Sequence, residues 1–557
     1  MKRMLQVLIL FAFIAALFGC SKETLNGSGS TSPPVVPVDS ATSAVAQTES
    51  AEVLDKDSTY SVEEPLKVIH VNITTYDGVY TFDQVNSDID PDDAFEPEVE
   101  AHFTADNYPD DGLKINSKVR LRGSSSRLAE QKSYRVKLAK GMPLWRGETT
   151  LQLNKHPWDL TRVRNKLAFD LFRYIPHLPS LRTQFMQVTV NGQEFGLFTH
   201  VEKMGKEYLI NRGLPTDGNI YKANEFTFQM VNELALDAAG KPVDLTAFER
   251  VLELENDNGN HANLINMLNA VNDPSKPLDA IFQTYFDRNN YIVWLATNIL
   301  VGNRDTTTQN FALYQPKDTK KFFFLPWDYD GAFGFENQPD IKAVNNLYAP
   351  AQSGVGNWWD VPLHRRFLED SRNRNDLKLA VMEIYNTYLT NDKIQARLDS
   401  YKALVEPFIT SSPDIDNLPT VSVVDKESEW ALEYARLVTA VKTNYYLFLA
   451  SIEQPLPFWQ SASVDGNLLV LAWDESVDLQ NDPVSYDIQV ATDPLLVNPV
   501  FSKSGFTGLN TTIPLPQAGT YYMRVTATDS AGNTSGAFDR FNEGNTAYFG
   551  VMQFELP

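Results

Sequence analysis

The sequence contains little cysteine and little histidine, and each shortage narrows the chemistry that the protein can perform. One cysteine occurs among 557 residues, which leaves no pair for a disulfide within the chain. The seven histidines are scattered and form no cluster with metal-ligand spacing. A metal-dependent hydrolase that uses Asp328 and Asp330 is therefore a less favoured hypothesis, because no group of histidines accompanies these acids.

Basic residues are outnumbered by acidic ones. The chain has 48 Lys and Arg against 71 Asp and Glu, which gives a net charge of −23 and a pI near 4.8. A surface this acidic repels nucleic acids and anionic lipids, so we expect no nucleic-acid partner. It favours cations and basic segments of other proteins.

The apolar run at the N-terminus, Leu5–Phe18, is too short to span a bilayer comfortably. It follows a basic start and ends just before Gly19 and Cys20. This arrangement resembles a bacterial lipobox, so we predict a lipoprotein signal peptide over residues 1–20, with lipidated Cys20 as the mature N-terminus. The alternative is an ordinary signal peptide that contains a cysteine. The lipobox interpretation places the protein in the cell envelope, at the outer membrane or cell surface, and in contact with the membrane through its lipid alone.

The length predicts several domains, because a single core rarely accommodates so many residues. Residues 21–62 are rich in Ser, Thr, Gly and Pro and are expected to form a flexible tether. A composition break at Pro455–Pro457 separates a domain at 63–453 from a module at 456–557. The module alternates apolar and polar residues in short strands. The segments that contain Trp473 and Tyr521 resemble strands of fibronectin type III domains. We predict an all-β immunoglobulin/fibronectin III-like sandwich, with its last hairpin turn at 529–533.

The stretch 289–334 organises the larger domain. Its apolar start predicts a buried helix, a polar loop follows at 302–310, and two short strands at 311–314 and 322–325 form a hairpin. Residues 327–331 close that hairpin. Because a hairpin brings its two ends together, we expect Asp305 and Asn310 to face Asp328 and Asp330. Residues 245–286, before this stretch, have mainly helical periodicity, as do several segments after 358.

These residue types and their spacing are typical of phosphoryl transfer. Asp305 and Asn310 reproduce the Asp-x-x-x-x-Asn spacing of a protein-kinase catalytic loop, in which the Asp accepts the proton of the acceptor hydroxyl. Asn310 and Asp328 would then hold Mg²⁺ or Mn²⁺ against ATP, because these cations prefer oxygen ligands. Asp330 is a reserve metal ligand or a turn cap. The alternative is that all of these residues are turn and capping residues.

Phosphate-binding candidates lie earlier in the chain. Arg122, Ser124 and Ser125 belong to a small-residue turn that offers positive charge, hydroxyls and backbone N–H groups to an anion, or else is a plain Ser-rich turn. Lys137 lies inside the next strand and is the candidate to neutralise nucleotide phosphates, with Lys132 as the second choice and a solvated surface role as the alternative. Glu202 is expected to pair with that lysine or to be a surface charge.

Four segments together resemble the CotH (spore coat protein H) kinase family of atypical protein kinases. They are LRGSSSRLAEQKSYRVKL (121–138), LTRVRNKLAFDLF (160–172), VTVNGQEFGLFTHVEK (188–203) and QNFALYQPKDTKKFFFLPWDYDGAFG (309–334). The resemblance extends over roughly residues 65 to 450 and lacks the Gly-x-Gly-x-x-Gly loop of ordinary kinases. It implies a two-lobed α+β kinase-like domain that transfers the γ-phosphate of ATP to Ser or Thr of a protein outside the cytoplasm. The alternative is a catalytically silent surface protein of the same fold, acting in binding, adhesion or envelope assembly.

Overall fold

The computed structural model describes residues 66–557 except 91–94, 107, 109, 111, 344–347, 423 and 545. The predicted signal peptide with Cys20 and the predicted tether at 21–62 lie outside the described residues. The described residues belong to one compact unit. Among the helices described, none has both the length and the apolar character needed to cross a membrane.

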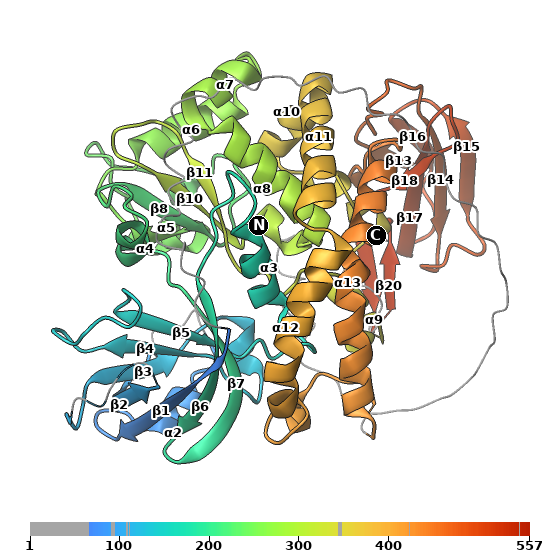
Figure 1. Ribbon diagram of the computed structural model, residues 1–557. Coiled ribbons are helices and arrows are strands. Elements are labelled where there is room, and N and C mark those ends of the chain that lie inside the picture. The colour runs from blue at the N-terminus through green and yellow to red at the C-terminus, as the bar shows by residue number, and fades with distance from the viewer. Residues whose placement is uncertain are drawn as a thin grey trace. The chain divides into compact units, whose positions relative to one another are not determined.

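The first part of the described chain is a closed barrel (Figure 1). Its strands, in the order in which they pair, are β1 (Val68–Tyr76), β2 (Val99–Ala105), β3 (Ser117–Leu121), β4 (Tyr134–Leu138), β5 (Thr150–Asn154), β7 (Gln193–Val201) and β6 (Thr183–Val190). Alternate residues such as Val119, Val136 and Leu153 fill the interior. Their neighbours therefore face outward, which places the charged residues of β3 and β4 on the outer surface.

The helix α3 (Arg164–Phe172) lies in the connection between the barrel strands β5 and β6. A second helix, α4 (Lys206–Asn211), and a second sheet follow the barrel; the sheet has the order β11 (Phe323–Pro326), β10 (Phe311–Gln315), β8 (Asn219–Ala223) and β9 (Leu252–Asn256). The helical prediction for 245–286 is wrong at β9, which separates α5 (Leu245–Val251) from the next helix. The strand Leu-Glu-Leu-Glu-Asn pairs with β8 and buries Leu252, so its alternation reflects a sheet edge.

In the larger domain, α8 (Arg288–Val301) is buried along most of its length and packs against α11 (Ser371–Thr387) and α13 (Lys426–Ser451). The other helices of this domain are α6 (Ala262–Asn272), α7 (Leu278–Tyr285), α9 (Pro339–Ala343), α10 (Pro362–Glu369) and α12 (Asn391–Ile409), whereas α2 (Phe82–Asn86) belongs to the barrel region and contacts β3. Asp287 caps the start of α8 by accepting the N–H of Asn290, and Gly302 ends it in the left-handed conformation. The polar loop therefore begins at a sharp stop that the glycine permits.

The C-terminal part is rich in β-strands, as predicted. One sheet contains β12 (Gln460–Asp465), β13 (Leu468–Trp473) and β16 (Asn510–Pro514); the other contains β15 (Phe501–Phe506), β14 (Ser485–Ala491), β17 (Gly519–Thr528), β18 (Thr534–Gly536) and β21 (Val551–Leu556); and β19 (Arg540–Glu543) pairs with β20 (Thr546–Phe549). Residues of both larger sheets, including Leu471 and Val525, share one hydrophobic core. The mixed α/β region is thus followed by a β-rich module with a core of its own.

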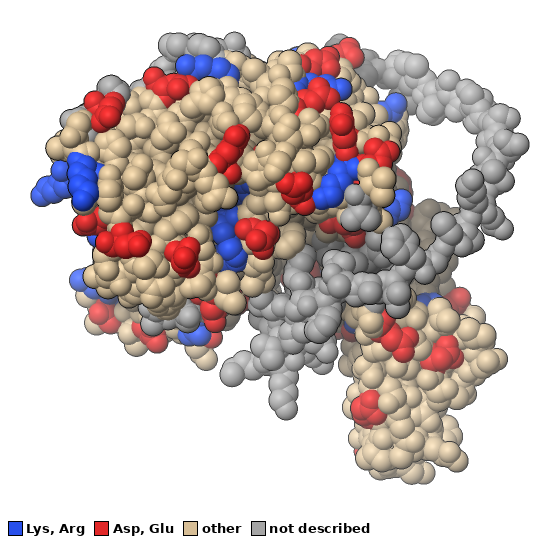
Figure 2. Space-filling model, turned by 90° about the horizontal axis from the view of Figure 1, so that it is seen from below, with Lys and Arg blue, Asp and Glu red and all other residues tan. Residues whose placement is uncertain are grey.

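Charged residues are distributed singly on the face seen in Figure 2. Asp and Glu are interspersed with Lys and Arg among uncharged residues there, so the negative charge of the chain is not gathered on this face.

Candidate active site

The polar loop after α8 holds Asp305 and Asn310 together. The amide of Asn310 donates a hydrogen bond to Oδ2 of Asp305 over 2.8 Å, and the amide of Gln309 donates to Oδ1 over 2.5 Å. Asn310 adopts φ of 59°, a left-handed conformation that asparagine tolerates better than most residues. The loop therefore presents an oriented carboxylate immediately before β10 begins.

The hairpin brings the acidic turn next to this loop. Phe311 pairs with Pro326, so Asn310 and Trp327 extend from the same end of the two strands. Asp328 also has a positive φ, 53°, and its carbonyl oxygen accepts a hydrogen bond from the amide of Asn303 over 3.1 Å. The predicted convergence of the two ends of the hairpin is therefore present.

The carboxylates of the turn influence one another strongly. Burial and the neighbouring charge of Asp330 raise the pKa of Asp328 to about 7. Burial opposes ionisation of Asp330 as well, but hydrogen bonds from His156 and Asp328 outweigh it and lower the pKa of Asp330. Burial, with a contribution from Asp330, raises the pKa of Asp305. Near neutral pH the turn thus holds two adjacent carboxylates that compete for a proton, a donor set that suits a divalent cation.

His156 was not predicted to belong to the site. Ligand atoms of His156, Asp328 and Asp330 lie within 4.8 Å of one another, and His156 Nδ1 is 3.1 Å from Asp330 Oδ2. The sequence showed no group of histidines beside these acids, and the structure adds a single one. His156 lies 174 positions before Asp330, in the connection between β5 and α3, and no local pattern marks it.

Asn165 on α3 determines which ring nitrogen of His156 carries the proton. The backbone N–H of Tyr329 donates to Asn165 Oδ1 over 3.0 Å, so the amide nitrogen of Asn165 faces His156 Nε2, at 3.3 Å. That nitrogen must donate, which makes Nε2 the acceptor and leaves the ring proton on Nδ1. His156 then donates to Asp330, and it positions this carboxylate rather than offering a free lone pair to a metal.

The turn after β3 supplies a positive charge from the barrel. Burial lowers the pKa of Arg122, while the charges of Asp328 and Glu255 oppose that effect, so this guanidinium is close enough to the acidic turn to interact with its charge. Ser124 and Ser125 are exposed beside it. Arg127, in the same turn, is buried in an ion pair with Asp88.

Lys137 and Glu202 are not brought together. Lys137 is exposed on the outer face of β4, where it borders a pocket with Glu98, Lys118, Arg120 and Arg135. Glu202 is fully buried and forms ion pairs with Arg182 and Arg212. Lys132, the second choice, donates to the carbonyl oxygen of Arg127 over 2.5 Å.

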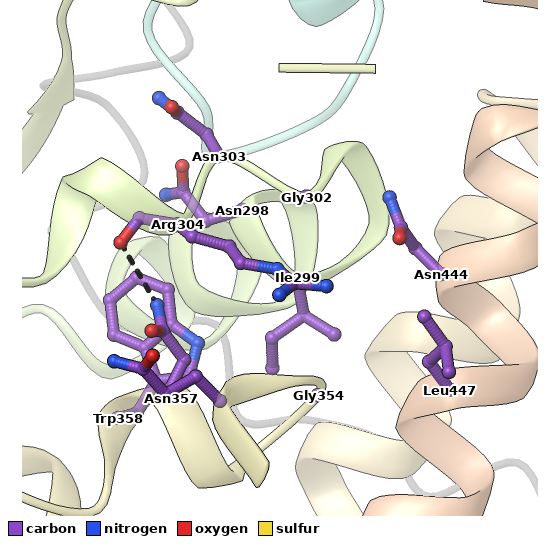
Figure 3. Close-up of a pocket in the computed structure, with 11 residues that line it drawn as sticks. Asn298, Ile299, Gly302, Asn303, Arg304, Gly354, Asn357, Trp358, Asn444 and Leu447 are labelled. Atoms are coloured by element: carbon purple, nitrogen blue, oxygen red, sulfur yellow. Dashed lines mark hydrogen bonds between the residues drawn. The ribbon is translucent and has the colours of Figure 1, made fainter. Parts of the chain in front are cut away.

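The polar loop that carries Asp305 also borders a small polar pocket, whose other lining residues support it (Figure 3). Asn357 donates to the carbonyl oxygen of Arg304 over 3.0 Å, the dashed line in Figure 3. Asn444 of α13 donates to the carbonyl oxygen of Leu300 over 3.1 Å and lies so close to Gly302 that a Cβ there would be 2.4 Å from its Nδ2. The position of Asp305 thus depends on α8, α13 and the segment around 357.

The barrel contributes Arg122 to the candidate site, and the helical region contributes the Asp305–Asn310 loop and the Asp328 turn. The family described as CotH kinase protein matches residues 119–446. This is more than half of the chain, and the chain therefore belongs to the CotH family.

A curated relative and a solved structure accompany this match. Inner spore coat protein H of Bacillus subtilis (strain 168) is 26% identical over 331 residues, which are 58% of this chain and 87% of that protein. The Helicobacter pylori proinflammatory kinase CtkA matches with 12% identity and a TM-score of 0.27, covering 57% of this chain and 94% of its own.

Proposed function

We propose that this chain is an active atypical protein kinase that transfers the γ-phosphate of ATP to a Ser or Thr hydroxyl. The observation that carries the proposal is the convergence of Asp305 and Asn310 with Asp328 and Asp330 at one end of a hairpin. Phosphoryl transfer relies on positioning and charge stabilisation, so a small set of groups of this kind is sufficient.

Asp305 is the proposed base. Gln309 and Asn310 fix both of its oxygens, so it meets an acceptor hydroxyl in one orientation. Burial raises its pKa, which makes the carboxylate a better proton acceptor than an exposed aspartate. When the hydroxyl oxygen forms its bond to phosphorus and the bond to the ADP oxygen breaks, the hydroxyl proton passes to Asp305.

Asn310 and Asp328 would hold Mg²⁺ or Mn²⁺, with Asp330 as a further ligand positioned by His156. The fit rests on the paired carboxylates, since the repulsion that raises the pKa of Asp328 disappears when a cation lies between them. A bound cation would neutralise the phosphate oxygens and orient them. We assign Asp328 the main ligand role because it lies two residues after β11, at the end of the hairpin from which Asn310 also extends.

Arg122 is the proposed phosphate ligand from the barrel, assisted by the exposed Ser124 and Ser125. Lys137 is proposed to neutralise phosphates of the nucleotide together with Arg135, which lies on the same face of β4. Glu202 belongs to the supporting structure in this proposal, because two arginines already hold it.

The proposal also covers the N-terminal lipid anchor, the location of the protein and the C-terminal module. We propose that Cys20 is lipidated, that the protein is held at the cell envelope, and that its protein substrate lies outside the cytoplasm. We further propose that residues 456–557 are a fibronectin type III-like sandwich that binds a partner or acts as a spacer. Two features support this class: strands from two sheets share a core, and the hydroxyl of Tyr521 donates to the carbonyl oxygen of Gln517 over 2.9 Å at the start of β17, as a tyrosine corner does.

The test is transfer from γ-labelled ATP by the full chain, with Mg²⁺ or Mn²⁺, to itself and to a generic Ser/Thr acceptor. Asp305→Ala and Asp328→Asn should each abolish transfer. Asp318→Asn, in the exposed turn of the same hairpin, is the matched control and should retain full activity. No transfer, together with no metal-dependent binding of any nucleotide, would refute the proposal and favour the catalytically silent binding protein.

A further inference from the structure

Three aspartates meet in the C-terminal module, far along the sequence from the candidate active site. Asp478 and Asp482 lie between β13 and β14, and Asp529 follows β17. One ligand oxygen from each of the three lies within 4.8 Å of the others. Each carboxylate repels the other two, so a positive charge among them would stabilise the cluster.

Asp478 has an oxygen that nothing in the described chain satisfies. Its side chain is nearly inaccessible, at 5% exposure, and its Oδ1 accepts the backbone N–H groups of Gln480 and Asp482, each over 2.9 Å. Its Oδ2 is shielded from solvent and has no hydrogen-bond partner among the described residues. A buried carboxylate oxygen without a partner is costly, and such groups are rare in folded proteins unless an ion or water completes them.

The neighbouring groups do not complete it. Both oxygens of Asp529 accept from Asn533, over 2.8 Å from the backbone N–H and over 2.8 Å from the side-chain amide. The guanidinium of Arg374 is near enough for its pKa to respond to the charge of Asp478. Its hydrogen bonds go to the carbonyl oxygens of Leu368, Glu369 and Leu479.

We infer that Asp478, Asp482 and Asp529 bind a calcium ion. Carboxylate oxygens from two loops are hard ligands of the kind that Ca²⁺ takes, and Ca²⁺ tolerates irregular loop geometry that Mg²⁺ does not. The free oxygen of Asp478 is the central ligand. Because the three residues come from two separate connections, the ion joins those connections to each other.

The site also lies at the junction between the module and the helical domain. Gln480 donates to the carbonyl oxygen of Ile452 over 2.6 Å, and Asn533 donates to the carbonyl oxygen of Glu453 over 2.9 Å, immediately after α13. The ion therefore stiffens the two loops that hold the segment leaving α13.

Calcium titration of the full chain by calorimetry tests the inference. Asp328→Asn serves as the background, because it removes the main candidate ligand of the other acidic site. In this background we expect one Ca²⁺ per chain with a dissociation constant below about 1 mM, the range of extracellular modules or tighter. Adding Asp478→Asn should remove the binding, and adding Asp482→Asn should weaken it at least tenfold. Asn at 478 retains the Oδ1 acceptor for both N–H groups, so the fold should persist, which far-ultraviolet circular dichroism checks.

Asp465→Asn, an exposed aspartate of the same module, is the matched control and should leave binding unchanged. A second readout is proteolysis of the segment 452–459, which Ca²⁺ should slow in the Asp328→Asn chain and not in the Asp328→Asn/Asp478→Asn chain. Absence of Ca²⁺ binding in the Asp328→Asn chain, or binding that Asp478→Asn does not change, would overturn the inference.

Discussion

Replacing Asp328 by Asn should stabilise the metal-free protein at alkaline pH while it abolishes activity. Asn has the shape of Asp but carries no charge, so it removes the repulsion from Asp330. The same substitution deletes the carboxylate that we propose binds the cation. Stability and function should therefore change in opposite directions at this residue, as happens where a site is costly to fold.

The size of the effect follows from the pKa of Asp328, which burial and Asp330 raise from 3.8 to about 7. Because the folded state binds the proton more tightly than the unfolded state, stability falls as pH rises from about 4 to 7 and then stays level. A pKa shift of this size lowers the free energy of unfolding by at most about 4 kcal/mol. Asp330 is 35% exposed and Asp328 is only partly buried, so solvent screens the repulsion and we expect about 1–2 kcal/mol at pH 8.

The assay is denaturant unfolding of the wild-type chain and the variant in EDTA, at pH 5 and pH 8. Asp328→Asn should be more stable at pH 8, and its advantage should shrink to less than half at pH 5, where Asp328 is protonated in the folded chain but ionised in the unfolded one. Saturating Mn²⁺ should reverse the order at pH 8, because only the wild-type chain retains the full site. A variant that is no more stable than wild type at pH 8, or that gains the same amount at pH 5, would show that the carboxylates do not repel one another as described.

Three further predictions concern the same site. Mn²⁺ affinity should fall about tenfold per pH unit below pH 7 and level off above it, because binding displaces the proton of Asp328; calorimetry at several pH values measures this, and a flat profile contradicts it. His156→Gln should weaken Mn²⁺ binding about 10–100-fold with little change in Tm, and unchanged affinity would remove the positioning role. Gly302→Ala should cost at least about 1 kcal/mol and lower kcat, because φ is +68° and Asn444 occupies the space; an unfolding curve and a rate identical to wild type would refute this.

Local patterns were sufficient to predict the hairpin and its two acidic ends. The strands at Phe311 and Phe323 are short and apolar, the turn between them is polar, and the pairing is between neighbours in sequence. A structure built from adjacent residues leaves little freedom in how its ends meet. The convergence of Asp305 with Asp328 could therefore be inferred without knowledge of the rest of the fold.

Residues that join the site from distant parts of the chain could not be predicted this way. His156 and Asn165 reach the turn only because α3 packs beneath it, and their spacing carries no sign of this contact. Alternation along β4 groups Lys137 with Arg135 on one face of the strand, yet a period of two does not say which residue lies nearest the acids. Arg122, at the end of the neighbouring strand, is the residue whose charge interacts with Asp328.

The paired carboxylates bear on the choice between an active kinase and a silent binding protein. Asp328 and Asp330 destabilise the metal-free fold at neutral pH, and a single change to Asn at 328 would remove that cost without altering the shape of the hairpin. A protein that used only its surface would gain stability from that change and lose nothing. A kinase would lose its cation. Asn165 and His156 form hydrogen bonds that hold the carboxylate of Asp330 beside that of Asp328. These hydrogen bonds keep the two carboxylates together although they repel each other. This arrangement favours the active kinase that we propose, because a bound cation would compensate both charges.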